Sequence, residues 1–230
     1  MSNIYIEVVP KLSLLSSLLP IIFFILFCFK TSIKGFWVIF IYNTTAFLFD
    51  VFVAASRWGM HHKLLLWNVY GMFEFLIIAY FFFLVTKQRL LRLLILLFSA
   101  LYLIFFFLSY KSDSDQFNSM MSSIGSVIIL ILSLSFIITS LGPSSIPVDV
   151  FTPIFLIVVG ILFYVSSTLF LYLIANNLSN DEMQKYWRIN DYSNILTNVI
   201  FSSAFLLYRF QHKDPTPESH SVDFTRTNDR

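Results

Sequence analysis

Two carboxyl side chains stand in apolar stretches of the sequence, where a charge is costly, and they are the residues best able to do chemistry. Glu74 is nine residues into the apolar run 65–86, and Asp50 is five residues before the end of the run 35–55. At a helical rise of about 1.5 Å per residue, they lie about 14 Å and about 7 Å below the same membrane face. Ionisable residues inside a membrane helix cost about 2.5–3.5 kcal/mol on insertion scales and commonly mark functional sites. Both are therefore candidates for ligand binding or acid–base work.

Further polar side chains recur on single helical faces of the apolar runs that follow. Residues three, four or seven positions apart share a helix face. With the two carboxyls, we predict that they line a polar interior that binds a ligand. The candidates are Asn43, Asp50, Tyr70, Glu74, Tyr164, Ser167, Asn194 and Asn198. The alternative stays open that the amides and hydroxyls only bond neighbouring helices, at about 0.6–2 kcal/mol each, and that Asp50 pairs with Arg57.

The elements that position these residues are membrane helices. Hydrophobic residues make up 57% of the 230 residues and charged residues 12%, against about 25% charged in a soluble domain. Seven runs reach the roughly 20 apolar residues that a spanning helix needs. They are Leu12–Phe29, Gly35–Ala55, Leu65–Thr86, Leu93–Tyr110, Ser119–Leu141, Phe151–Ala175 and Tyr192–Tyr208. The sequence predicts an all-α integral membrane bundle of seven transmembrane helices over residues 1–210, and a polar, disordered tail over 211–230.

The polar stripes and the loop charges predict an arrangement and an orientation for this bundle. Polar stripes fall on the second, third, sixth and seventh runs, so these would surround the interior, whereas the first and fourth would be peripheral. With seven spans, nine of the 15 Lys and Arg residues lie on the side of the C-terminus. Basic residues favour cytoplasmic loops. We therefore expect the N-terminus outside and the C-terminus in the cytoplasm, with the protein in the inner membrane of a bacterium.

The sequence lacks the residues that several classes of protein require. The last run has no lysine for a retinal, and the chain contains no Ser–His–Asp set, HExxH sequence or phosphate loop. His61 and His62 are adjacent and have no third metal ligand nearby. We assign no catalytic residue, metal or cofactor. A net charge of +2 gives no reason to expect a nucleic-acid partner.

A few spaced residues carry a family resemblance. They are the Leu-Leu-Pro of residues 18–20, which we expect to kink the first run, Tyr70 four residues before Glu74-Phe75, the series Phe155, Gly160, Tyr164 and Leu171, and the pair Asn194 and Asn198. In these the chain resembles small uncharacterised bacterial proteins with seven transmembrane helices, and it is similar in layout to the membrane sensor halves of histidine kinases. The resemblance draws attention to Tyr70, Glu74, Gly160, Tyr164 and Asn198.

The sequence thus predicts a sensory or signalling accessory of the membrane. A small molecule or lipid would enter the polar interior and change the packing of the helices. Because the polar tail is too short to fold alone, the signal would pass to a separate membrane or cytoplasmic partner. The alternative is an intramembrane enzyme or small-solute transporter that uses Asp50 and Glu74.

Overall fold

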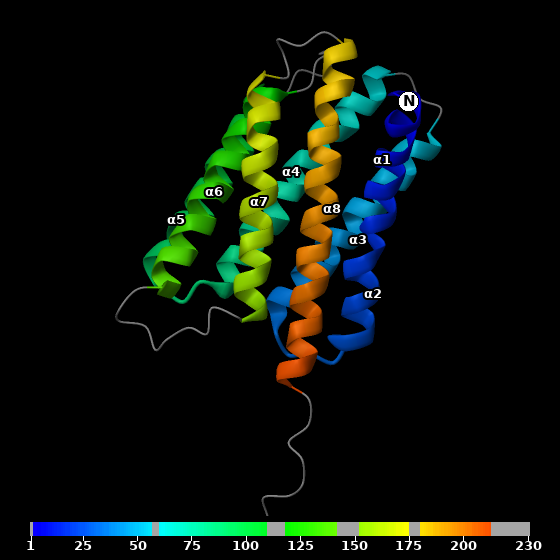
Figure 1. The fold of residues 1–230 in the computed structure, drawn as a ribbon. Helices are drawn as coiled ribbons and strands as arrows, with labels where there is room; N and C mark the ends of the chain where they lie inside the picture. The colour runs from blue at the N-terminus through cyan, green and yellow to red at the C-terminus, as the bar shows by residue number, and fades with distance from the viewer. Residues whose placement is uncertain (1, 57–59, 110–117, 142–151, 175–179, 213–230) are drawn as a thin grey trace, which may run out of the picture.

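The described part of the protein is a bundle of long helices. A computed structural model describes residues 2–56, 60–109, 118–141, 152–174 and 180–212, and within these ranges the chain forms helices and no strand. The helices are α1 (Ser2–Ser16), α2 (Leu18–Phe27), α3 (Lys34–Ala55), α4 (Met60–Val85), α5 (Arg89–Ser109), α6 (Ser119–Leu141), α7 (Pro153–Ile174) and α8 (Asn180–Gln211). They lie side by side, and α1 begins at one end of the bundle whereas α8 ends at the other (Figure 1). The predicted tail beyond residue 212 lies outside the described residues.

Six helices in the described part are long and apolar enough to cross a membrane. Their apolar segments are Val8–Phe27, Lys34–Ala55, Leu65–Val85, Arg89–Ser109, Ser119–Leu141 and Pro153–Ile174. They match the first six predicted runs to within a few residues. The seventh run, Tyr192–Tyr208, belongs to α8, which does not reach the same apolarity because its inward face carries Asn194, Asn198 and several hydroxyls. By length and composition, the structure therefore supports a membrane bundle with six such helices rather than seven.

The first predicted run forms two helices, α1 and α2, which are separated one turn before Pro20. Proline has no N–H to donate to the carbonyl of residue 16 and crowds the preceding turn, and α1 gives way to α2 at Ser17, three residues before Pro20. The Ser16 and Ser17 hydroxyls each donate a 2.7 Å hydrogen bond to a carbonyl one turn earlier, those of Ser13 and Leu14. The kink expected from Leu-Leu-Pro is confirmed.

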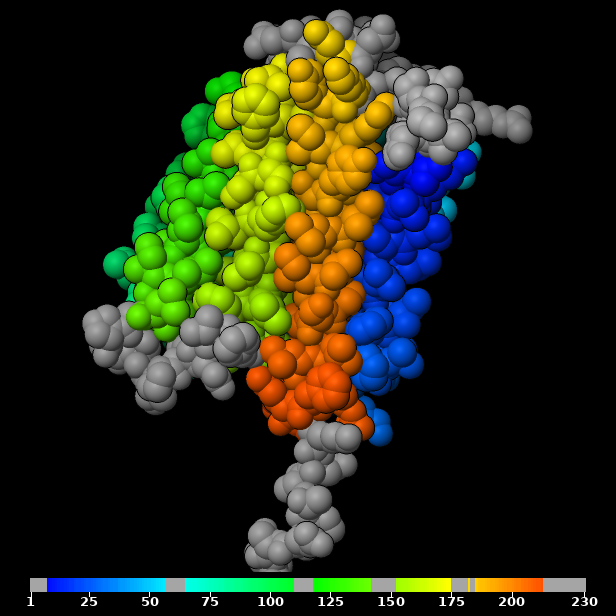
Figure 2. Space-filling view, viewed as in Figure 1, coloured from blue at the N-terminus to red at the C-terminus, as the bar shows by residue number. Residues whose placement is uncertain are grey.

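Helix α8 lies between α7 on one side and α1 and α2 on the other (Figure 2). Fully buried phenylalanines of α2, α3 and α8 form this part of the core, with the rings of Phe24 and Phe205 5.5 Å apart and those of Phe36 and Phe205 also 5.5 Å apart. The expectation that the first run is peripheral is wrong, because its kink places Ser16 against α8. Helix α5, the fourth run, packs on α4 and α6 at the edge, as expected.

Candidate functional site

Glu74 sits at the point where three helices meet. It is the tenth residue of the apolar segment Leu65–Val85 of α4, which places it near mid-depth. The hydroxyl of Tyr42 on α3 donates a 2.9 Å hydrogen bond to Glu74 Oε1. Tyr164 on α7 is a second polar neighbour of the same carboxyl. Among the described side chains, the carboxyl is therefore held by a tyrosine hydroxyl and not by an ion pair.

A cleft of about 220 Å³ opens beside this carboxyl, between α3 and α4. Its lining is Tyr42, Thr45, Phe49, Tyr70, Phe73, Glu74 and Ile77. The spacing of these residues along each helix puts them on one face of α3 and one face of α4. The rings of Phe49 and Tyr70 stack with centroids 4.2 Å apart. Phe73 is 53% exposed, so the cleft opens on the side of the bundle.

An aromatic column continues from Glu74 along α7 and α8. Tyr172, two turns along α7 from Tyr164, interacts with the hydroxyls of Tyr164 and Thr168. Its ring lies 6.5 Å from that of Trp187 on α8. Trp187 in turn stacks on Trp67 of α4, with centroids 5.5 Å apart and planes 5° from parallel. Side chains of α4, α7 and α8 are thereby in contact on one side of the Glu74 site.

Two further carboxyls, one on α3 and one on α8, lie near the site, toward the end of the bundle where α3 leads into α4. Asp50 is exposed on α3 and interacts electrostatically with Glu74 and with Asp191 of α8. Asp191 directly precedes the apolar run of α8, and burial raises its pKa to about 6, an effect that the nearby Arg188 partly opposes. The suggested partner of Asp50, Arg57, lies outside the described residues.

The structure separates the predicted site residues into two groups. Tyr70, Glu74 and Tyr164 come together, and Asp50 lies close enough to act on Glu74 through its charge. Four others do not join them. Asn43 donates to the carbonyl of Ile39, Ser167 donates to that of Phe163, Asn198 donates to Ser16 Oγ at 2.9 Å, and Asn194 is half-buried on α8.

Asp50, Tyr164 and Asn198 are not among the residues that line the α3–α4 cleft. Asn198 instead joins α8 to the kink of the first helix. The side chains of His61 and His62 lie outside the described ones. Among the side chains that are described, no three of His, Cys, Asp and Glu gather into a metal-binding group.

Three aromatic cleft residues, Tyr42, Phe49 and Phe73, were not predicted from the sequence, and neither were Thr45 and Ile77. Aromatic residues are so common in this chain, with 28 phenylalanines, that their presence near a carboxyl is no signal. Their positions did carry a signal, because Tyr42 and Phe49 are seven residues apart and Ile77 is four residues after Phe73 and three after Glu74. Comparison with protein-family models, curated proteins and solved structures finds no match to this chain.

Proposed function

We propose that this protein is a membrane sensor of seven transmembrane helices, in which the α3–α4 cleft binds a small molecule or lipid. The observation that carries the proposal is the Glu74 carboxyl at mid-depth, bonded by Tyr42 and open to a cleft. A carboxyl in this position is costly to keep. A helix-to-helix bond would need only an amide or a hydroxyl, so the cost points to a ligand.

In this proposal α8 is both the seventh span and the output. It has 32 residues and runs the length of the bundle beside α7 (Figure 1). Trp187 stacks on Trp67 of α4, and Phe201 packs edge-on against Tyr42 at 6.4 Å. A ligand that moves α3 or α4 would therefore displace α8, whose C-terminal end would pass the change to a separate membrane or cytoplasmic partner.

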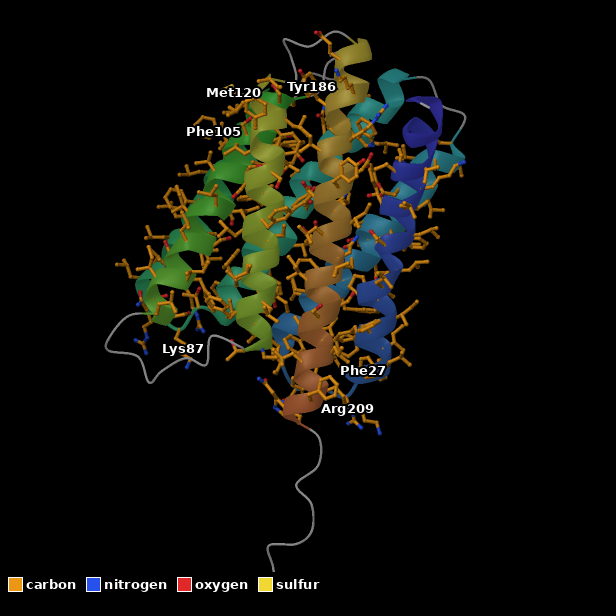
Figure 3. The ribbon with its side chains drawn as sticks, in the orientation of Figure 1. Phe27, Lys87, Phe105, Met120, Tyr186 and Arg209 are labelled. Carbon is orange, nitrogen blue, oxygen red and sulfur yellow. The ribbon has the colours of Figure 1, made fainter. Side chains whose placement is uncertain are left out.

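The orientation of the proposal rests on the basic residues. Lys87 and Arg209 lie at the same end of the bundle as Phe27, while Met120 and Tyr186 lie at the other end (Figure 3). Lys30, Lys34 and Arg89 flank the helix ends that meet there. Under the positive-inside rule this end faces the cytoplasm, with the N-terminus outside and the protein in a bacterial inner membrane. The likeness in layout to kinase sensor halves belongs to the same proposal.

A filled cleft tests the ligand site. Thr45 is exposed at the cleft and would place a large ring in it as Thr45→Trp, whereas Thr139→Trp adds the same ring on an exposed position of α6. We expect native mass spectrometry of protein released from the expressing membrane to show a bound adduct in the wild type and in Thr139→Trp. The adduct should be absent from Thr45→Trp. Equal adducts in all three proteins would contradict the proposal.

The output through α8 has its own test. Spin labels replace the exposed Leu90 and Phe210 in a Cys28→Ala background, and their separation is measured with and without an organic extract of the source membrane. We expect the extract to shift the distance distribution in the protein with an open cleft and not in the Thr45→Trp form. If the adduct is present but the distance between the labels does not change, the protein binds a ligand and does not act as a sensor through α8.

A second function has one observation in its favour. Asp50 and Glu74 interact electrostatically at two depths below one membrane face, as acids along a proton or cation path would. A small-solute transporter or an intramembrane enzyme would use both. Uptake coupled to a proton gradient in proteoliposomes, lost in Glu74→Gln and in Asp50→Asn, would favour the transporter over the sensor.

A further inference from the structure

The lining of the α3–α4 cleft has a composition that suggests its ligand class. Four of its seven side chains are aromatic, namely Tyr42, Phe49, Tyr70 and Phe73, and a fifth is the Glu74 carboxyl. An aromatic face carries negative charge density and attracts a cation placed over it, and clustered rings are the usual means of recognising substituted ammonium groups. A carboxyl beside such rings adds a full negative charge when ionised.

Among the side chains that the structure describes, no basic residue lines the cleft. In the six apolar helices of the described part, Lys and Arg occur only in the first four residues of a segment: Lys11, Lys34, Arg89 and Arg92. Asp50 is exposed about 7 Å nearer to the membrane face than Glu74, from the helical rise, and adds a second negative group near the site. The charges of the site are thus complementary to a cation.

The size and the opening of the cleft limit the cation further. A volume of about 220 Å³ is below the about 300–1,000 Å³ of sites for drug-sized ligands, so the enclosed group is small. The exposed ring of Phe73 and the apolar Ile77 stand at the side opening, within the apolar segment of α4. An apolar substituent of the ligand would extend there into the bilayer.

We propose that the cleft binds an organic cation, a protonated amine or a quaternary ammonium, with its charge between Glu74 and the rings of Tyr42, Phe49 and Tyr70. This inference rests on the proposed function of the cleft as a ligand site and names the chemistry of the ligand. The proposal excludes a neutral lipid as the ligand, because a neutral group has no charge to pair with an ionised carboxyl.

Pairs of probes of equal shape test the charge directly. The protein is placed in nanodiscs of phosphatidylglycerol, which contain no ammonium headgroup. Binding of choline is compared with that of 3,3-dimethyl-1-butanol, in which carbon replaces the charged nitrogen, and benzylamine is compared with benzyl alcohol. We expect the cation of at least one pair to bind at least tenfold more tightly than its neutral partner. Equal affinities within both pairs would overturn the inference.

Three variants assign the effect to the cleft. Glu74→Gln keeps the shape and hydrogen bonding and should remove most of the preference for the cation. Phe49→Leu keeps an apolar side chain without a π face, and should weaken cation binding about two- to thirtyfold, as expected for one cation–π contact. Phe105→Leu makes the same change at an exposed position of α5, outside the cleft, and should leave both affinities unchanged. Thermal unfolding of each variant establishes that it is folded, and a folded Glu74→Gln protein with full cation preference would refute the role of Glu74.

The two proposals fail separately. If Thr45→Trp loses its native adduct while both cations bind no better than their neutral partners, the ligand site stands and the organic cation is excluded. If Thr45→Trp keeps the adduct and neither cation binds, the cleft is not a ligand site and both proposals fall.

Discussion

At the scale of single residues, this protein holds the Glu74 carboxyl in apolar surroundings with tyrosine neighbours. Glu74 Oε1 accepts a bond from Tyr42, and Tyr164 is a second polar neighbour. Removing one partner of a buried polar pair costs about 1–3 kcal/mol, because the group left behind loses both water and its bond. The two tyrosines therefore matter to the carboxyl whether or not a ligand is bound.

Asp191 provides a prediction at this scale, because burial raises its pKa from 3.8 to about 6. The folded protein then holds this proton more tightly than the unfolded chain does, so Asp191 costs stability increasingly as the pH rises from about 4 to about 6. Asp191 is partly exposed, and screening by solvent reduces the cost to about 1 kcal/mol. We expect Asp191→Asn to raise the midpoint of thermal unfolding by about 2–4 °C above pH 6.

The gain in thermal midpoint from Asp191→Asn should shrink as the pH falls from about 6 and vanish below about pH 4. Unfolding midpoints of the wild type and Asp191→Asn, measured in one detergent across the pH range, check it. A constant difference at every pH would mean that the substitution acts through shape or hydrogen bonding and not through the charge.

At the scale of helices, close approach depends on small residues and on bonds between distant segments. Thr197 of α8 lies 3.5 Å from the carbonyl of Gly160 on α7, and Asn198 reaches Ser16 beside the break that Pro20 causes. Small residues allow helix backbones to approach in membranes, and polar side chains then bond across the gap. These contacts hold α8 between α7 and the first helix, in the place that the proposed output requires.

Gly160 and Gly71 form a matched pair for testing this packing. A Cβ added at Gly160 would lie 2.9 Å from the ring of Phe201 and 3.1 Å from a methyl group of Ile200, whereas one added at Gly71 would meet nothing within 4 Å. Alanine is favoured over glycine in a helix by about 1 kcal/mol, and overpacking costs about 1–3 kcal/mol. Gly71→Ala should therefore raise the thermal midpoint, and Gly160→Ala should lower it or leave it unchanged. A larger gain for Gly160→Ala than for Gly71→Ala would show that α7 and α8 are not closely packed there.

At the scale of the whole molecule, the question is how often the chain crosses the membrane. Six helices qualify by length and apolarity, yet α8 packs along α7, α1 and α2, and the two ends of the described chain lie at opposite ends of the bundle (Figure 1). In lipid a helix satisfies its own backbone groups. Its polar side chains are tolerated where they face the interior of the bundle. Asn198 and Ser202 are buried in this way.

Reporter fusions decide between six and seven crossings. A reporter in the connection between α3 and α4 should be outside, and one after His212 should be in the cytoplasm. Both reporters on one side would mean that α8 does not cross. Exchanged sides would keep seven crossings and reverse only the orientation.

The sequence by itself determined the features that depend on local chemistry. Seven apolar runs were predicted to span, and six of them coincide to within a few residues with helices apolar enough to do so, because a chain in lipid must bond its own backbone. The missing N–H of Pro20 predicted the break in the first helix, and counting residues along α4 predicted the depth of Glu74. The tertiary structure decided which faces meet: that Tyr42 and not Asn43 reaches Glu74, that Phe49 stacks on Tyr70, and that Asn198 bonds Ser16. These contacts join residues on different helices, and the rotation and choice of neighbour of each helix follow from packing against all the others, which the periodicity of one segment does not contain.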